Sequence, residues 1–412
     1  MRIVALTFGT EGDTRPMLAL CRGLIDAGYE VLVLAERSGA AHAHSLGVPF
    51  VALDGDMKAE LLAATDLWRH GEDVKHVARE LSRIGATHAA SWMRTTLSHA
   101  RGAHAILCAG IAIYVGLSCA EALGIPAIGV ALQPMMPTRA FGSPFLPLPR
   151  LPRFLNRASH RIVLAMLWRA FRGAINDARR DVANQPPRRR EWDGYPILFG
   201  MSPPLVPRPA DWPSRFFVTG YWWLPHDDAF QPDADLAAFL GAGEVPIYVG
   251  FGSMIGFDRE RMLAIVLDAL DGRRALVQAG WSDFGRGALS ASVHRIGPMP
   301  HAWLFPRTRI VVHHGGAGTT HSAARSGVPS VVIPLAADQF FWADRLHRLG
   351  VAPKGLPHRD ASASALDARL RAADASAMHA RAREVGESIA KETGVANAIA
   401  RIDALLSRRA TA

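Results

Sequence analysis

Eight residues rich in glycine and histidine, 313–320, have the composition of an anion-binding turn. They read His-His-Gly-Gly-Ala-Gly-Thr-Thr and lie between a predicted strand at 309–312 and a predicted helix. Glycines let the backbone approach a ligand closely, and the first amides of a helix point outward with a partial positive charge. Such a helix start suits a diphosphate, with His314, Gly318 and Thr319 as its contacts. The alternative is a tight turn that binds nothing.

A second strand–turn–helix unit places a carboxylate where a ligand would bind. After the strand at 2–8, the turn at 9–12 leads to Asp13, and Pro16 follows three residues later. Ligands of parallel α/β sheets bind beyond the carboxyl ends of the strands, so Asp13 has the place of a general base that takes a proton from a hydroxyl. The alternative is that Asp13 only caps the helix, with Pro16 in its first turn.

Two further turns carry polar side chains directly after predicted strands. Ser253 follows a glycine after the strand at 246–251, and a small hydroxyl there can bond a phosphate oxygen. Asp338 and Gln339 follow the strand at 330–334. An acid beside an amide can both accept and donate hydrogen bonds to vicinal sugar hydroxyls. The alternative for this pair is an N-cap of the next helix.

No metal site is predicted. The 17 histidines are scattered and form no His-Glu-x-x-His motif. Two Asp-x-Asp pairs, Asp54 with Asp56 and Asp233 with Asp235, have carboxylates of the kind that hold a divalent ion on a diphosphate. Neither pair lies beside the glycine-rich turns, so both are interpreted as solvated loops. The sequence therefore predicts chemistry without a metal or another cofactor.

The elements around these turns predict two parallel sheets. Short apolar strands alternate with helical segments in the first half, and the same texture returns in the second half, which implies right-handed βαβ crossovers. Strands are expected at residues 2–8, 30–35, 50–53, 105–107, 127–131, 246–251, 274–278, 309–313 and 330–334. We therefore predict an α/β fold of two doubly wound, Rossmann-like domains that face each other across a cleft.

Four other stretches differ in composition from this alternating pattern. A proline-rich loop is expected at 133–153, an arginine-rich helix at 154–184 and a closing helical region at 374–407, interrupted at Gly394. A segment rich in proline and aromatic residues, 203–224, separates the two halves. The predicted divisions are a first domain at 1–215, a second at 216–390 and a final helix at 391–412.

Composition limits the class of protein. The chain has 412 residues, 49% of them hydrophobic, which suffices for two domains of ordinary size. No apolar run is long enough to predict a membrane span, and the N-terminus has the pattern of a strand rather than a signal peptide. Three cysteines (Cys21, Cys108 and Cys119) are too few for a disulfide framework and favour a reducing cytoplasm. The net charge of +9 comes without a basic segment typical of nucleic-acid binding.

Residues 296–349 resemble the donor-binding signature of the UDP-glycosyltransferases. The likeness rests on Ile-Gly-Pro-Met-Pro-His-Ala-Trp-Leu-Phe at 296–305, His-Gly-Gly-Ala-Gly-Thr-Thr at 314–320 and Ala-Asp-Gln-Phe-Phe-Trp at 337–342. Similarity to the sterol 3-beta-glucosyltransferases extends over nearly the whole chain, through residues 9–16, 156–176 and 203–222. The chain also resembles the bacterial glycosyltransferases of glycopeptide antibiotic biosynthesis.

The resemblance implies the GT-B fold and a role for each motif residue. Asp13 matches the family's base, and Asp338 and Gln339 match the residues that hold the donor hexose. The positions that match groups near the diphosphate are Thr10, Gly12, Ser253, His314, Gly316, Ala317, Gly318 and Thr319. Those that match the surroundings of the nucleobase are Met299, His301 and Trp281.

Two positions depart from the plant members of that superfamily. Asp13 stands where those enzymes have the histidine of a His–Asp dyad, and Ser322 stands where they have a glutamate for the ribose. Direct catalysis by the carboxylate is therefore expected in place of a dyad. The resemblance also implies that the C-terminal helix crosses back to the first domain.

The implied function is that of an inverting, metal-independent glycosyltransferase. Its donor would be a nucleotide sugar, UDP-glucose in the first instance, and its acceptor a lipophilic alcohol such as a sterol or secondary metabolite. The acceptor is expected at the proline-rich loop, which contains Met135, Met136 and Phe141, with ordinary loop packing as the alternative. Two other functions stay open: a TDP-sugar-dependent transferase of antibiotic or glycolipid biosynthesis, and a catalytically silent nucleotide-sugar-binding protein.

The arginines at 157–190 allow two interpretations. They can dock the protein on an anionic membrane that holds a lipid acceptor, which would make it a peripheral membrane protein. The alternative is a solvated basic face. The sequence predicts no nucleic-acid partner and no particular oligomeric state.

Overall fold

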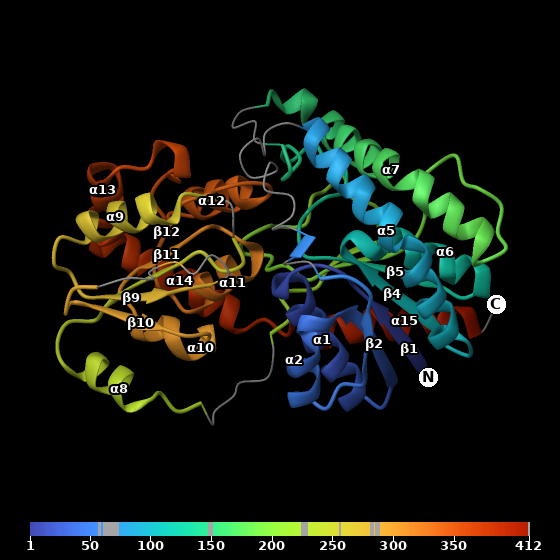
Figure 1. The fold of residues 1–412 in the computed structure, drawn as a ribbon, viewed down its shortest axis with the longest axis horizontal. Helices are drawn as coiled ribbons and strands as arrows, with labels where there is room; N and C mark the ends of the chain where they lie inside the picture. The colour runs from blue at the N-terminus through green and yellow to red at the C-terminus, as the bar shows by residue number, and fades with distance from the viewer. Residues whose placement is uncertain are drawn as a thin grey trace. The chain divides into compact units, whose positions relative to one another are not determined.

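The computed structural model describes residues 1–56, 59–60, 74–146, 151–223, 230–254, 257–280, 284 and 289–410. The chain folds into two compact units, Met1–Leu224 with Thr393–Ala412, and Pro225–Glu392 (Figure 1). Across the described residues, no helix has the length and apolar character that crossing a bilayer requires. Each unit is built on its own parallel sheet, as the alternating strands and helices predict.

The sheet of the first unit has seven parallel strands in the order β3-β2-β1-β4-β5-β6-β7. They are β1 (Arg2–Leu6), β2 (Glu30–Glu36), β3 (Phe50–Leu53), β4 (Ala105–Ala109), β5 (Ala127–Ala131), β6 (Ile197–Phe199) and β7 (Phe216–Val218). The order reverses between β1 and β4, so the crevice beyond their carboxyl ends is the expected ligand site of this unit. The turn that carries Asp13 follows β1 at this point.

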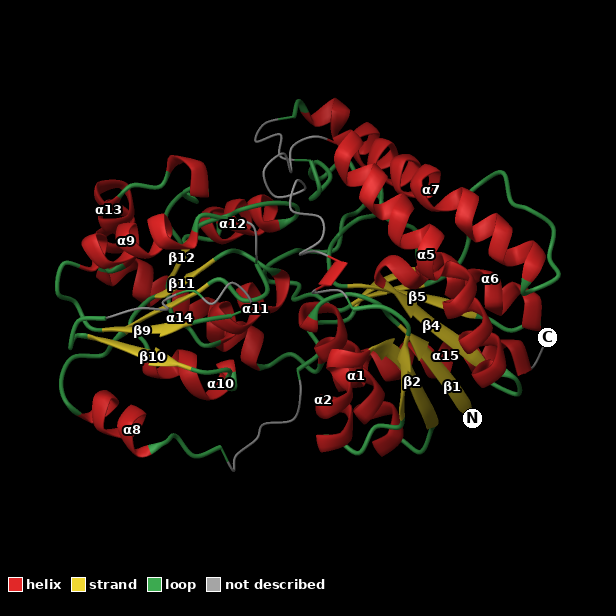
Figure 2. Cartoon of the chain, in the orientation of Figure 1, coloured by secondary structure: helices red, strands yellow, loops and turns green. Residues whose placement is uncertain are grey.

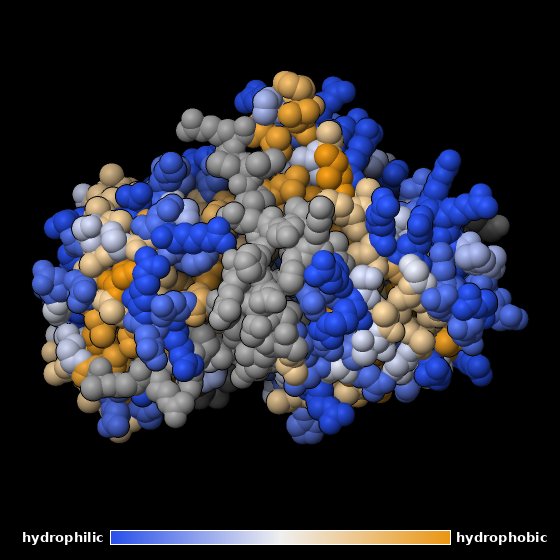
Figure 3. Space-filling view, turned by 45° about the horizontal axis from the view of Figure 1, so that its top comes forward, coloured by the Kyte–Doolittle hydropathy of each residue, from blue (hydrophilic) through white to orange (hydrophobic). Residues whose placement is uncertain are grey.

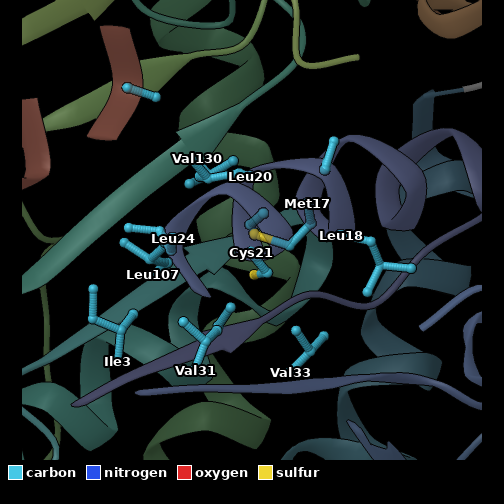
Figure 4. Packing of buried hydrophobic residues seen from close by; sticks show 14 of the residues in the cluster. Ile3, Met17, Leu18, Leu20, Cys21, Leu24, Val31, Val33, Leu107 and Val130 are labelled. Carbon is cyan, nitrogen blue, oxygen red and sulfur yellow. The ribbon is translucent and has the colours of Figure 1, made fainter. Parts of the chain in front are cut away.

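Helices cover both faces of this sheet because successive side chains of a strand point to opposite sides. Ile3 and Ala5 pack with α1 (Glu11–Asp26) and α15 (Gly394–Ala410), whereas Val4 and Leu6 pack under α5 (Val74–Ala100), α6 (Ile113–Leu123) and α7 (Asn156–Asp181). Figure 4 shows Ile3 in this first cluster with Met17, Leu20 and Leu24 of α1. The shorter helices of this unit are η1 (Arg37–Gly39), α2 (Ala40–Ser45), η2 (Gly110–Ala112) and η3 (Arg153–Leu155).

The second unit holds five parallel strands in the order β10-β9-β8-β11-β12 (Figure 2). They are β8 (Ile247–Gly250), β9 (Ala275–Gln278), β10 (Val293–Ile296), β11 (Val311–His313) and β12 (Ser330–Val332). The order reverses between β8 and β11. The turns after these two neighbouring strands therefore meet at one edge of the sheet, where a ligand of this fold binds.

Two sets of helices cover the second sheet. Ile247 and Val249 of β8 face a core that includes α9 (Arg259–Leu270) and α13 (Ala363–Ala373). Tyr248 faces the other core, with α8 (Ala234–Gly241), α10 (His301–Leu304) and α11 (Ala317–Arg325). The remaining helices are η4 (Phe305–Arg307), α12 (Gln339–Arg348), η5 (His358–Asp360) and α14 (Ser376–Ala390).

The units end at other residues than the sequence indicates. β7 lies beyond the expected boundary at 215, but it pairs with β6, so the first unit continues to Leu224. The closing helical region is divided into α14 and α15, and α15 packs against α1 within the first unit. A Cβ at Gly394 would stand 2.3 Å from the carbonyl oxygen of Tyr221, so glycine is required where α15 begins.

Candidate active site

Asp13 lies in the first turn of α1 and takes part in its N-terminal cap. Thr10 is the N-cap residue, and its backbone N–H donates a hydrogen bond of 3.0 Å to Asp13 Oδ2. The Thr10 hydroxyl also donates to Asp13 Oδ2, at 3.4 Å, and accepts from the backbone N–H of Gly12 at 3.3 Å. The capping interpretation of Asp13 therefore holds, and it fixes where the carboxyl group lies.

Gly9 leaves room for this carboxyl group. A Cβ at position 9 would lie 2.3 Å from Asp13 Oδ2, so any larger residue would displace it. Burial raises the pKa of Asp13 from 3.8 to about 6, against the lowering effect of its hydrogen bonds from Thr10. A carboxylate with a pKa near 6 is ionised at neutral pH and is a stronger base than an exposed aspartate. The arrangement can both cap a helix and remove a proton.

His314 is the first residue after β11 in the second unit, and its side chain lies against the turn that follows β8. Its side chain is buried, with 7% of the residue exposed. A Cβ at Gly252 would stand 3.1 Å from its Cε1, and a Cβ at Gly316 would stand 2.4 Å from its Nε2. Gly252 also has a φ of +57°, which favours glycine. The absence of a side chain at both glycines thus leaves the space that the imidazole occupies.

Both neighbouring histidines are neutral at physiological pH. Burial lowers the pKa of His314 to about 4, and it lowers the pKa of His313 well below its ordinary value. His313 Nδ1 accepts the backbone N–H of Gly315 at 3.1 Å, which orients the turn. Within the described part of the chain, His314 Nδ1 and His313 Nε2 are buried without a hydrogen-bond partner. His314 therefore offers a neutral imidazole beside the glycine turn rather than a fixed positive charge.

The N-terminus of α11 has no side-chain cap. Gly316 holds the N-cap position, its carbonyl accepts from Thr320 N, and no acidic residue occupies the first turn. The amides of Ala317, Gly318 and Thr319 precede the first amide with an intrahelical partner, so they carry the partial positive charge of the helix end. Such an end can bind an anion through its backbone.

Gln339 ties the turn after β12 to the turn after β8. Its side-chain oxygen accepts the backbone N–H groups of Leu335 at 2.7 Å and Ala336 at 3.1 Å. Its amide nitrogen donates to Met254 Sδ at 2.8 Å, and Met254 follows Ser253. Gln339 therefore brings the predicted hexose and phosphate turns together, and its oxygen already has two donors.

Asp338 stands at the N-cap position of α12 without a side-chain cap bond. Its Oδ2 accepts the indole N–H of Trp342 at 2.8 Å, and the preceding residue, Ala337, has a φ of +53°. A non-glycine residue in the left-handed region is strained, and strain of this kind gathers at ligand sites. The side chain is thus oriented by Trp342 rather than by the helix end.

Two of the predicted nucleobase residues, Met299 and His301, follow β10 in the chain. His301 begins α10 and stacks on Phe305, with ring centroids 4.3 Å apart, and Met299 packs against the core under α10. Trp281 falls outside the described residues. Gly280, directly before it, has a φ of +59°, and a Cβ there would stand 2.2 Å from the carbonyl oxygen of Gly252. The loop after β9 therefore packs on the turn that faces His314.

A buried histidine that the sequence reasoning did not single out as functional holds the predicted acceptor loop. His160 lies in the second turn of α7, with Nδ1 2.8 Å from the carbonyl oxygen of Met135 and Nε2 3.1 Å from that of Phe141. Asn156 Nδ2 donates to the carbonyl of Arg139 at 3.0 Å. Met135, Met136 and Phe141 are half-buried, so the loop is both fixed and partly open to solvent. In the sequence, the only sign of these contacts between α7 and the loop is the stretch Asn-Arg-Ala-Ser-His at 156–160.

The Asp-x-Asp pairs serve local structure. Asp56 accepts the backbone N–H of Ala59 at 2.9 Å, and Asp233 caps α8 through the N–H of Leu236 at 2.8 Å. A search of the described residues finds no group of three or more histidine, cysteine or acidic side chains placed to hold a metal ion. The three cysteines are buried free thiols.

Residues 279–405 match the family described as the erythromycin biosynthesis protein CIII-like C-terminal domain. The chain is 30% identical over 415 residues to a sterol 3-beta-glucosyltransferase of Arabidopsis thaliana, covering 97% of this chain and 67% of the relative. It is 32% identical over 434 residues to the O-mycaminosyltylonolide 6-deoxyallosyltransferase of Streptomyces fradiae, covering 100% and 99%. Fungal sterol 3-beta-glucosyltransferases also match, and the chain spans between 26% and 34% of their length.

Solved structures share the fold. The glycosyltransferase VinC, crystallised in complex with dTDP, superposes with a TM-score of 0.67 at 18% identity, over 99% of this chain and 100% of that one. The match extends over both units, so the two parallel sheets have the arrangement of elements found in GT-B glycosyltransferases.

Proposed function

The chain belongs to the GT-B glycosyltransferase family, together with the Arabidopsis thaliana and Streptomyces fradiae relatives. On that premise we propose that it is an inverting transferase that needs no metal ion. Its donor is a nucleotide diphosphate hexose, UDP-glucose in the first instance. Its acceptor is a hydroxyl of a lipophilic molecule such as a sterol or a secondary metabolite.

The observation that carries this proposal is the uncapped start of α11 beside a neutral, buried His314. The first three amides of α11 have no intrahelical partners. Its first turn has none of the acidic residues that usually compensate the positive start of a helix. The imidazole lies against Gly316 and Gly252, and Ser253 follows in the same turn. A diphosphate bound there would receive backbone and imidazole hydrogen bonds in place of a metal ion.

The proposed reaction is a single displacement. The carboxylate of Asp13 accepts the proton of the acceptor hydroxyl, and the acceptor oxygen forms a bond with the anomeric carbon of the donor. The bond from that carbon to the diphosphate oxygen breaks, and its electron pair leaves with the nucleoside diphosphate. The amides at the start of α11 stabilise the negative charge that develops on this leaving group. One displacement inverts the anomeric configuration.

Asp338 and Gln339 are the proposed contacts of the hexose. The Asp338 carboxylate is oriented by Trp342 and can accept hydrogen bonds from sugar hydroxyls. Gln339 has its oxygen bound to the turn after β12 and one amide hydrogen bound to Met254 Sδ, so only its second amide N–H is proposed to reach the sugar. The two side chains thus present one acceptor and one donor.

The test incubates the protein with radiolabelled UDP-glucose and a panel of sterols, flavonoids and hydroxy lipids, with and without EDTA. We expect a β-linked glucoside by NMR and a rate that EDTA leaves unchanged. An α-linked product contradicts the single displacement, and loss of turnover in EDTA contradicts the metal-independent part of the proposal.

A second candidate is transfer of a deoxysugar from a dTDP donor. The observation in its favour is that the Streptomyces fradiae 6-deoxyallosyltransferase matches along essentially its full length. Calorimetric titration with UDP and dTDP distinguishes the two donors, since the cognate nucleotide binds more tightly. Tight nucleotide binding without hydrolysis or transfer for any sugar would instead support a silent nucleotide-sugar-binding protein.

A further inference from the structure

The helix η3 and the first turns of α7, which directly follows it, carry a group of exposed apolar side chains. Phe154 is 81% exposed, Ile162 is 54% exposed and Leu155 is 38% exposed. We call these three residues the α7 patch. The other exposed large hydrophobic residues of the described chain, Met1 and Val245, lie far from it in sequence. Figure 3 shows hydrophobic residues gathered at the top of the molecule, where Figure 1 places the start of α7.

The α7 patch is surrounded by positive charge. Arg153, Arg157 and Arg161 are exposed beside it, and residues 122–176 contain no aspartate or glutamate. Arg153 and Arg161 form no ion pair with any residue that the structure describes. Arg157 lies within electrostatic reach of Asp211, which belongs to another part of the chain. This end of α7 therefore has a net positive surface around its apolar side chains.

The opposite face of the same two helical turns is rigid. Asn156, Ser159 and His160 are buried and hold the loop that contains Met135 and Phe141. Ser159 Oγ also accepts the backbone N–H of Ser143 at 2.8 Å. The helix end is thus fixed on one side to the loop proposed for the acceptor and open to solvent on the other.

We propose that the α7 patch docks this protein on an anionic lipid bilayer, with Phe154 and Ile162 inserted at the level of the headgroups and the arginines bound to lipid phosphates. A stable protein interface needs roughly 800 Å² on each partner, whereas three protruding apolar side chains cover a small area. Peripheral membrane binding requires only a few inserted side chains and several basic residues, which is what this helix end presents. Docking here would bring the loop that contains Met135 and Phe141 to a lipophilic acceptor in the bilayer. This consequence rests on the proposed function, whereas the lipid binding itself does not.

The experiment is co-sedimentation of the purified protein with vesicles of phosphatidylcholine alone or mixed with phosphatidylglycerol. We expect binding to the anionic vesicles only, weakened by added salt. The substitutions Phe154→Ser with Ile162→Ser should reduce the partition coefficient by about tenfold or more. The charge reversals Arg153→Glu with Arg161→Glu should reduce it by at least about thirtyfold.

Matched controls use exposed residues elsewhere. Val245→Ser, and Arg94→Glu with Arg101→Glu, should bind vesicles as the wild type does, since these residues are exposed outside the α7 patch. All variants should keep the wild-type nucleotide affinity and the wild-type rate on a water-soluble acceptor without vesicles. Failure of turnover in every variant and the wild type would count against the proposed function and leave the vesicle result readable.

Three outcomes would overturn the docking proposal. One is the absence of vesicle binding by the wild type, and another is equal binding to neutral and anionic vesicles. The third is self-association of the wild type, lost in the α7 patch variants, without lipid binding; the patch would then serve a second copy of the chain.

Discussion

The two strand–turn–helix units at β1–α1 and β11–α11 have the same local plan and opposite electrostatics. Both helices have glycine as their second residue, Gly12 and Gly318. The third residue is Asp13 in α1 and Thr319 in α11. In α1 a threonine cap and two acidic residues compensate the helix end, whereas α11 begins at a glycine without a side-chain cap or an acid. The positive charge at the start of α1 is therefore compensated within the protein, whereas that at the start of α11 is not.

Both units also use a glycine to make space for one functional side chain. A Cβ at Gly9 would stand 2.3 Å from the Asp13 carboxyl, and a Cβ at Gly316 would stand 2.4 Å from the His314 imidazole. In the first unit the backbone N–H and the hydroxyl of the N-cap Thr10 hold a built-in carboxylate. In the second unit we propose that the first amides of α11 hold a substrate's phosphates. On the proposed function, the residue at the third helical position determines whether such a turn supplies a base or an anion-binding site.

The substitution Asp13→Asn should have the largest effect on catalysis. Loss of the base should lower kcat by about 100- to 10,000-fold, while the affinity for UDP, measured by calorimetry, stays as in the wild type. Glu11→Gln, which changes an exposed acid of the same turn, is the matched control and should keep its rate. Wild-type turnover by Asp13→Asn would remove Asp13 from the mechanism.

The same variant should be at least as stable as the wild type at pH 7.5. Folding raises the pKa of Asp13 from 3.8 to about 6, so the stability this group contributes is full below pH 3.8 and is lost as the pH rises through 6. Asparagine removes the buried charge and keeps an oxygen that can accept from Thr10 N. A lower melting temperature at pH 7.5 for Asp13→Asn would show that the charge itself stabilises the cap.

The substitution Thr319→Asp transfers the acidic third position of α1 to α11. The helix should keep or gain stability, because an acid in the first turn is favourable there. The dissociation constant for UDP should rise by at least about a hundredfold, since a like charge would face the diphosphate. Thr319→Asn is the neutral control of similar size, and equal losses in the two variants would argue against the electrostatic explanation.

Alanine at the two space-making glycines should misplace the side chains beside them. Gly9→Ala should lower kcat, and Gly316→Ala should raise the KM for the donor, each by about tenfold or more. Gly173→Ala in α7 is the control, because a Cβ there meets nothing within 4 Å and its φ is not positive. Unchanged kinetics in Gly316→Ala, with a crystal structure showing His314 in place, would contradict the role of this contact.

The pH profile should show one acidic limb. Since the Asp13 pKa is about 6, kcat/KM should rise with pH through that value and be about tenfold lower at pH 5 than at its plateau. His314, with a pKa of about 4, stays neutral over this range and should add no second limb. A limb that persists in Asp13→Glu with a shifted midpoint supports the assignment, and an unshifted midpoint assigns the titration to another group.

The main features of both sites could be predicted from the residues alone. Strand–glycine–helix transitions are local, so the turns at Asp13 and His314 were visible without knowledge of the fold. The sequence does not predict β6 and β7, because no helix separates them in the chain and their pairing depends on distant neighbours. The contacts of Gln339 and His160 cannot be predicted from the sequence, because their partners are distant in the chain: the sulfur of Met254 for Gln339, and the carbonyls of Met135 and Phe141 for His160.

The central claim is that the start of α11 binds the diphosphate and that Asp13 acts only on the acceptor. Calorimetric titration of UDP into the wild type, Asp13→Asn and Thr319→Asp tests it most directly. Circular dichroism should first show that the three preparations are equally folded. We expect Asp13→Asn to bind UDP like the wild type and Thr319→Asp to bind it at least about a hundredfold more weakly. If Thr319→Asp bound UDP with wild-type affinity, or if Asp13→Asn lost UDP binding, this division of roles would be contradicted.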